Sequence, residues 1–258
     1  MRSEMKKYRK LLVALSFSAA LVSCDDGRIY PETVVSSEGK TVVLEGVLDG
    51  LDSWTSSYRV SIAGFEGADD EYADVSKVIS ASDVVNGKVN VELSGIKENV
   101  TLVRLCILDR LRKHIVTFSE VDVSKATEVV KMDVGTINIS MFNAIQQAFF
   151  NTTCANCHGA SNRAAAGLYL TEGKSYEALV DVDSKKVEGK KLVETNNANN
   201  SVLHMVLNQQ KVEGISMDHR DLVSEKNEMT ILPLIDSWGT GKQSRSPGMK
   251  YNAVPGMI

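Results

Sequence analysis

The sequence predicts two domains in succession, an antiparallel β-sandwich followed by a mainly α-helical domain. Between residues 41 and 133, apolar and polar residues alternate with a period of two in segments rich in Val, Ile, Thr and Leu, as in half-buried strands. After Ile139, apolar residues recur every three to four positions, as on one face of a helix. A chain of 258 residues is long enough to build a core in each domain.

The first 23 residues are expected to be an export signal and not part of the fold. Five basic residues lie within the first ten, and an apolar run from Leu11 to Val22 follows. A stable bilayer anchor needs about 20 apolar residues, so this shorter run is typical of a secretory signal. Its end, Leu21-Val22-Ser23-Cys24, resembles the lipobox of bacterial lipoproteins. That resemblance implies that Cys24 is lipidated; the alternative is an ordinary signal peptide with an incidental cysteine.

Charge is unevenly distributed along the mature chain. Residues 24–137 contain 12 basic and 20 acidic residues, whereas residues 138–258 contain 12 of each. Nucleic-acid binding needs a basic surface, so no nucleic-acid partner is expected. The charge of −8 on residues 24–137 would instead attract a basic partner protein.

Six segments of the first domain have the pattern of strands. The pair Asn86-Gly87 lies at the start of one of them and suits a type I′ hairpin turn, because both residues tolerate positive φ. Short strands at spacings of about a dozen residues, with no helical stretch between them, predict an immunoglobulin-like sandwich over residues 41–137, preceded by a tether at 24–40. The predicted strands are Thr41–Leu48, Tyr58–Ala63, Lys88–Leu93, Val100–Leu108, His114–Phe118 and Glu128–Asp133.

The second domain, residues 138–240, is expected to contain three amphipathic helical segments, followed by a C-terminal tail at 241–258. Apolar residues mark one face of the first segment, from Ile139 to Phe149. The terminal segment has Ser224 as its N-cap, but Pro233 would cost about 3 kcal/mol inside a helix. We therefore predict a short helix that ends before Pro233 and a second one that packs Trp238 against the first segment.

One motif carries most of the functional information: Cys154-Ala155-Asn156-Cys157-His158, followed by Gly159. The C-x-x-C-H spacing is the attachment signature of c-type haem. Two thiols three residues apart can reach two vinyl groups on one porphyrin edge, and the next imidazole can bind the iron. A thioredoxin-like pair is disfavoured because the motif follows a helix, and a zinc site because no second ligand pair exists. A disulfide between Cys154 and Cys157 remains an alternative.

The stretch from Ile145 to Trp238 resembles the monohaem cytochrome c domain of bacteria. Beyond the motif, the similarity lies in Gly167-Leu168-Tyr169-Leu170, in Ser201-Val202-Leu203, and in a late Met before a terminal helix that ends in Trp. The resemblance implies one covalent haem c, with His158 as the proximal iron ligand. It also implies single-electron transfer to a redox partner protein.

The second axial ligand is less narrowly defined. In the family it is a Met, typically followed by Pro, and Met217 stands at the corresponding place before the terminal helix. However, Asp218 replaces the usual Pro. The alternatives are His219, His204 and Met205, or an iron with an open sixth position.

These features predict a c-type cytochrome lipoprotein that transfers single electrons in the bacterial cell envelope. Asp25-Asp26-Gly27 resembles the export signal of surface lipoproteins in Bacteroidota, which implies the outer membrane, on its periplasmic or surface side. The alternative is retention in the inner membrane, which an acidic residue at this place implies in enterobacterial lipoproteins. One alternative is a surface lipoprotein whose sandwich binds a glycan or protein, with an accessory haem domain. Another is a haem-based sensor or peroxidase-like enzyme. An electron carrier is favoured over an enzyme, because a six-coordinate iron suits electron transfer and only one haem motif is present.

Overall fold

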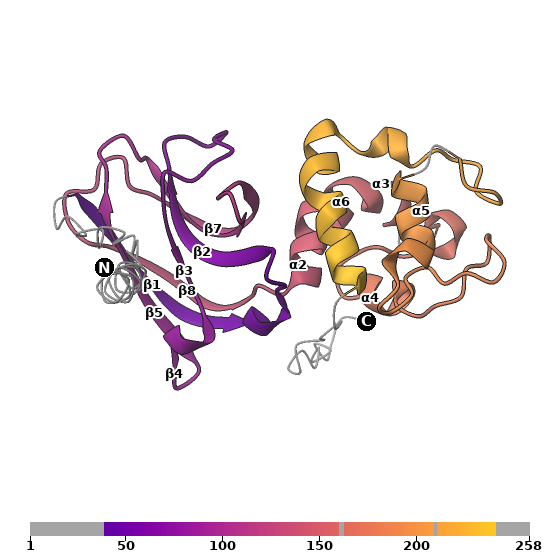
Figure 1. The fold of residues 1–258 in the computed structure, drawn as a ribbon, viewed down its shortest axis with the longest axis horizontal. Helices are drawn as coiled ribbons and strands as arrows, with labels where there is room; N and C mark the ends of the chain where they lie inside the picture. Colours follow the sequence, from indigo (N-terminus) through magenta and orange to yellow (C-terminus); the bar gives the residue numbers. More distant parts are fainter. Residues whose placement is uncertain (1–38, 160–162, 209–210, 241–258) are drawn as a thin grey trace, which may run out of the picture. The chain divides into compact units, whose positions relative to one another are not determined.

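The computed structural model describes residues 39–159, 163–208 and 211–240, and it shows a β region followed by a mainly helical region (Figure 1). The predicted signal segment, Cys24 and the predicted tail at 241–258 lie outside the described residues. Among the described helices, none combines the length and the apolar character needed to cross a membrane.

The β region consists of two four-stranded sheets, with strand orders β4-β5-β1-β8 and β3-β2-β6-β7. Every pairing between the described strands is antiparallel except that of β1 with β8, which is parallel. This pair corrects the prediction of a wholly antiparallel arrangement. β1 and β8 are the first and last strands of the region, so a long connection joins them, as parallel neighbours require. The strands are β1 (Lys40–Asp49), β2 (Tyr58–Phe65), β3 (Val75–Val78), β4 (Val84–Val85), β5 (Lys88–Ile96), β6 (Leu102–Asp109), β7 (His114–Asp122) and β8 (Val130–Asn138).

All six predicted strands are confirmed, with ends shifted by a few residues. The turn between β4 and β5 is also confirmed, because Asn86 and Gly87 have φ values of 53° and 77°. Two strands were not predicted. β3 and β4 have four and two residues with no buried position, so neither carries a readable alternation.

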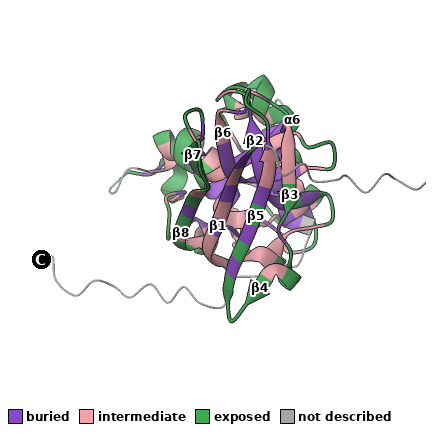
Figure 2. Ribbon diagram, turned by 90° about the vertical axis from the view of Figure 1, so that its left-hand side faces the viewer, coloured by how far each residue is buried: buried purple, intermediate pink, exposed green. Residues whose placement is uncertain are grey.

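Side chains from both sheets belong to one hydrophobic core. Buried and exposed positions alternate along β5, as Figure 2 shows. Leu44, Ile62 and Leu105 are fully buried in this core. Cys106, on the same strand as Leu105, lies in a separate small cluster with Phe65 and is also fully buried. Alternation along this strand predicts that Cys106 faces away from the main apolar set and is half-buried. The first expectation is confirmed, and the second is wrong because the side chain is fully buried.

A helical segment runs from Met141 to His158, in the place where the apolar face predicted one. It begins at Ser140, whose Oγ accepts a hydrogen bond from the backbone N–H of Asn143 (3.4 Å). The middle of the segment is a π-helix, which the sequence pattern did not indicate. The α-helices are α2 (Met141–Ile145), α3 (Ala155–His158), α4 (Ser175–Leu179), α5 (Val202–Asn208) and α6 (Glu225–Thr240), and the π-helix is η4 (Gln146–Cys154). Short 3-10 turns are η2 (Leu51–Ser53), η3 (Ala81–Asp83), η5 (Ala165–Gly167), η6 (Ala198–Asn200) and η7 (Arg220–Leu222).

The terminal helix corrects another prediction, because α6 continues through Pro233 without a break. Ser224 is its N-cap as expected, with Oγ accepting from the N–H of Asn227 (3.2 Å). Pro233 lies on the exposed side of α6, between buried neighbours. The carbonyl of Met229, which Pro233 leaves without its helical partner, belongs to an exposed residue, so water can satisfy it. That location reduces the cost of the proline.

Aromatic packing joins the two ends of the helical region. The ring of Trp238 on α6 lies 5.1 Å from that of Phe142 on α2, centre to centre, and the two helices run side by side (Figure 1). Phe142 also contacts Phe150 and Tyr176 edge-on. The predicted packing of Trp238 against the first helical segment is therefore confirmed.

Candidate functional site

The helical region encloses a cavity of about 570 Å³, within the size range of cofactor pockets. Side chains from η4, α3, α5 and the loops around residues 165–170, 182–186 and 214–222 line it. Most of the lining is aliphatic, including Leu168, Leu179 and Leu203. Such a lining would favour a ligand that is largely apolar.

Both cysteines of the motif and His158 line this cavity. Cys154 ends η4 and is half-buried, and Cys157 is exposed on α3. Both thiols are free. Burial raises the pKa of Cys154 to about 12, whereas catalytic redox cysteines have a lowered pKa. The arrangement therefore does not favour thioredoxin-like chemistry.

Gly159 allows a close backbone contact at the end of the motif. A Cβ at this position would overlap the backbone carbonyl oxygen of Ala155. Only glycine fits so close to the preceding helical turn. This contact gives a physical reason for the glycine that follows the histidine.

The imidazole of His158 is held by the segment that follows the motif. Its Nδ1 donates to the carbonyl oxygens of Ala165 (3.1 Å) and Leu168 (3.2 Å). In turn, the backbone N–H of Leu170 donates to the His158 carbonyl (2.9 Å). Since a carbonyl only accepts, the proton is on Nδ1 and the lone pair is on Nε2, as a metal ligand requires. Burial lowers the pKa of His158 despite these bonds, which favours the neutral ring.

A buried amide supports this segment from behind, and sequence reasoning missed it. Gln146, 2% exposed on η4, donates from Nε2 to the Leu170 carbonyl (3.0 Å) and to Asn151 Oδ1 (2.7 Å). Its Oε1 accepts from the buried hydroxyl of Ser175. The sequence signal that could have identified Gln146 is its place as a polar residue within an apolar helical face.

The candidates for the second axial ligand divide into two groups. Met217 and His219 line the cavity. His204 and Met205 are not among the described residues that line it; His204 Nδ1 instead pairs with Asp236 Oδ1 (2.6 Å), and Met205 packs against the core.

The ring of His219 lies opposite that of His158. Their centres are 6.3 Å apart and their planes differ by 23°. His219 Nδ1 donates to the Met217 carbonyl (3.1 Å). Both rings therefore carry a proton on Nδ1, which leaves Nε2 as the nitrogen that could face a metal ion.

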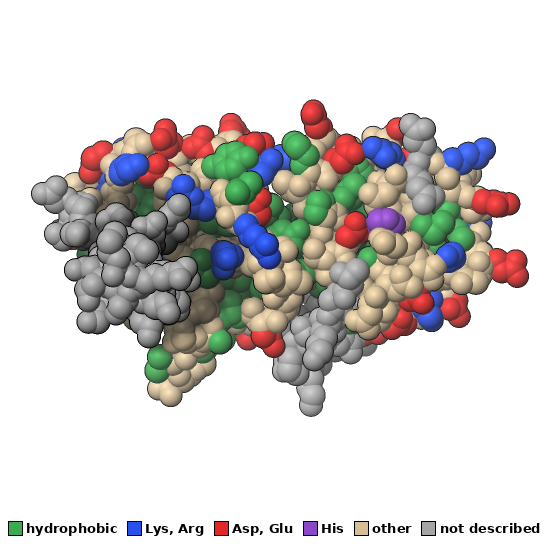
Figure 3. Space-filling view, viewed as in Figure 1, with side chains coloured by type: hydrophobic (Ala, Val, Ile, Leu, Met, Phe, Trp, Pro, Cys, Tyr) green, Lys and Arg blue, Asp and Glu red, His purple; other side chains and the backbone are tan. Residues whose placement is uncertain are grey.

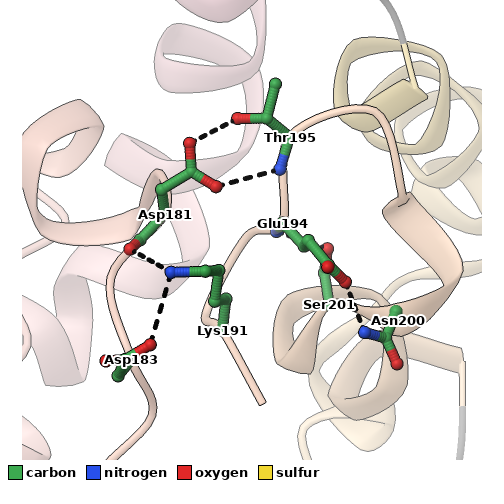
Figure 4. Close-up of polar contacts among 7 residues, drawn as sticks. All are labelled: Asp181, Asp183, Lys191, Glu194, Thr195, Asn200 and Ser201. Carbon is green, nitrogen blue, oxygen red and sulfur yellow. Dashed lines mark hydrogen bonds and ion pairs between the residues drawn. The ribbon is translucent and has the colours of Figure 1, made fainter.

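A polar network stiffens the loop that forms one wall of the cavity (Figure 4). Asp181 Oδ2 accepts from Thr195 Oγ1 (2.6 Å), and Lys191 Nζ bridges the Asp181 carbonyl (2.8 Å) and Asp183 (3.3 Å). The hydrogen bonds from Thr195 lower the pKa of Asp181. Glu194 binds Ser201 through its N–H (2.8 Å) and accepts from Asn200 through its carboxylate. The network thereby ties the loop to the start of α5.

Gly214 allows the far loop to approach this wall. It has φ of 86°, and a Cβ would overlap the carbonyl oxygen of Lys186. Both residues line the cavity. The absence of a side chain at Gly214 therefore allows the loop that carries Met217 and His219 to pack closely against the backbone at Lys186.

The donor set fits a covalently held haem better than a bare metal ion. Within the described part of the chain, no group of three or more His, Cys, Asp or Glu could bind a metal. A haem iron already has four porphyrin nitrogens and needs only axial ligands from the protein.

No family model, curated protein or solved structure matches the chain.

Proposed function

We propose that this protein is a c-type cytochrome that holds one covalent haem and transfers single electrons in the cell envelope. The observation that carries the proposal is the convergence of Cys154, Cys157 and His158 on one apolar cavity. His158 has its Nδ1 proton fixed by two carbonyls. That combination is the one expected for a thioether-bound haem with a histidine iron ligand.

Attachment needs no oxidant. The S–H of Cys154 and that of Cys157 would each add across one vinyl C=C of the haem, so that a C–S bond would form and the thiol hydrogen would go to the other vinyl carbon. The bound iron would supply a one-electron Fe(III)/Fe(II) couple.

The surrounding residues have three tasks in this proposal. The Ala165 and Leu168 carbonyls keep His158 neutral and oriented. The aliphatic lining excludes water, which limits reorganisation around the iron when its charge changes. The exposed position of Cys157 brings one edge of the site close to solvent, where a partner protein can approach.

The finer features of the fold and location belong to the same proposal. The β region is an immunoglobulin-like sandwich, and the helical region is a cytochrome c domain. Lipidation of Cys24 anchors the protein to the outer membrane, on its periplasmic or surface side. Acidic and basic side chains are mixed on the face shown in Figure 3, so attraction of a basic partner would depend on the net −8 of residues 24–137.

The test is expression of the full chain in cells that carry a cytochrome c maturation system. We expect one haem that resists acid-acetone extraction and stays with the polypeptide in denaturing electrophoresis and mass spectrometry. Cys154→Ala and Cys157→Ala should each remove one thioether, and the double variant should lose all covalent haem. Cys106→Ala is the matched control, because Cys106 lies outside the cavity, and it should keep the haem. A matured wild-type chain with both thiols alkylatable and no haem would overturn the proposal.

A further inference from the structure

The loop from Gly214 to Leu222 presents two side chains to the cavity that could bind iron opposite His158. Met217 is 46% exposed, whereas His219 is half-buried. The ring centres of His158 and His219 are 6.3 Å apart.

This separation has a direct chemical meaning. The atoms of a five-membered ring with bonds of about 1.33 Å lie about 1.1 Å from its centre. An imidazole nitrogen binds a metal ion at about 2.0–2.1 Å. Two imidazoles on opposite sides of one metal ion therefore have centres about 6.2–6.4 Å apart. The observed 6.3 Å falls within that range, and the two planes, which differ by 23°, are nearly parallel, as the rings of two imidazoles bound to one metal ion from opposite sides can be.

Hydrogen bonds from Nδ1 to backbone carbonyls orient both imidazole rings. His158 donates from Nδ1 to carbonyls of its own segment, and His219 donates from Nδ1 to the carbonyl of Met217. Within the described residues, neither Nε2 takes part in a hydrogen bond. Outer partners of this kind are what orient metal-binding imidazoles. Met217 therefore contributes to the arrangement through its backbone.

The residue between the two candidates supports this assignment. Asp218 stands where the cytochrome c pattern has Pro, and its Oδ1 accepts from the N–H of Arg220 (2.9 Å). This bond closes the turn at the start of η7, just after His219. Arg220 then binds Glu228 on α6 (2.8 Å). A proline at 218 has no carboxylate and could not close the turn that positions His219.

We propose that His219, and not Met217, is the second axial ligand of the haem iron, so that two neutral imidazoles hold it. This inference rests on the proposed function. A Met ligand favours Fe(II) and raises the reduction potential, whereas two imidazoles stabilise Fe(III) and lower it. The protein therefore works at a lower potential than a His/Met cytochrome.

The test uses the matured full-length protein and reads the iron spectroscopically. The ferric wild type should be low-spin. It should lack the weak far-red absorption band that the cytochrome c resemblance implies for Fe(III) with a Met ligand. Met217→Leu should keep the low-spin spectrum, because Met217 contributes through its backbone carbonyl. His219→Ala should convert the iron to a high-spin or water-bound form, and added imidazole should restore the low-spin spectrum.

A second variant keeps the test decisive if His219→Ala folds poorly. His219→Met should retain the haem, gain the far-red band and raise the potential. A wild-type far-red band that disappears in Met217→Leu would overturn the inference while leaving the proposed function intact. So would a low-spin His219→Ala protein without added imidazole. A wild-type chain without covalent haem would instead overturn the proposed function itself.

Discussion

Replacing Gln146 by Leu should destabilise the helical region by about 2–6 kcal/mol. The substitution keeps the side-chain size but removes the hydrogen bonds to the Leu170 carbonyl and to the Ser175 hydroxyl. Ser175 is 1% exposed, so water cannot easily replace the lost partner. A buried polar group left without its partner costs about 1–3 kcal/mol, and two such groups are affected.

The measurement is urea unfolding of the full chain, followed by the far-UV helix signal, which reports mainly the helical region. The control is Gln147→Leu, because Gln147 is the adjacent residue and is exposed. It should change the free energy of unfolding by no more than about 0.5 kcal/mol.

A double-mutant cycle with Ser175→Ala isolates the pair. In the Gln146→Leu background, Ser175→Ala should cost less than in the wild type, because the hydroxyl has already lost its acceptor. The coupling should be about 0.5–3 kcal/mol. Equal effects of Gln146→Leu and Gln147→Leu, or strict additivity in the cycle, would refute the bracing role of Gln146.

Three other predictions concern backbone, pH and thiols. Gly214→Ala should lower the urea midpoint of the helical transition more than Gly189→Ala, because both have positive φ but only Gly214 meets a neighbouring carbonyl; equal shifts would contradict this. The pKa of Asp181 is lowered by hydrogen bonds in the folded state. Its stabilisation is therefore present above its unfolded pKa of about 3.9 and is lost as the pH falls through the folded value. In the Asp181→Asn variant, the free energy of unfolding should fall less steeply as the pH is lowered into the acid range. The same acid dependence as in the wild type would contradict this. In the haem-free protein, a thiol reagent should label the exposed Cys157 quickly. It should label Cys106 only on unfolding, because this thiol is buried and burial raises its pKa to about 12. Peptide mass mapping measures the labelling of both cysteines.

Short-range patterns accounted for most of the secondary structure. The strands with a buried face, such as β5, show the alternation that burial imposes on a sequence. β4, at Val84–Val85, has no buried face and exists because it pairs with β5 across the Asn86-Gly87 turn. The parallel pairing of β1 with β8 is a non-local property, which alternation within either strand cannot specify.

The error at Pro233 came from applying an average cost without the position on the helix. The cost of a helical proline is largest where the freed carbonyl is buried. In α6 that carbonyl belongs to exposed Met229, while Leu232 and Leu234 on either side of Pro233 are buried. Packing of the buried face outweighs a partner that water can replace, so the helix continues.

The two halves of the candidate site differ in how far sequence could define them. The attachment side is local: Cys154, Cys157 and His158 lie on consecutive helical turns, so their spacing alone specifies a shared surface. The opposite side depends on a loop about 60 residues further on, where Met217 and His219 are only two positions apart and the chain pattern favours the first. The direction of each side chain there is decided by the turn that Asp218 closes and by the carbonyl that receives the His219 proton. In the proposed cytochrome, a substitution of the one residue between two candidate ligands would therefore exchange a thioether for an imidazole and shift the haem potential, while the attachment motif stays the same.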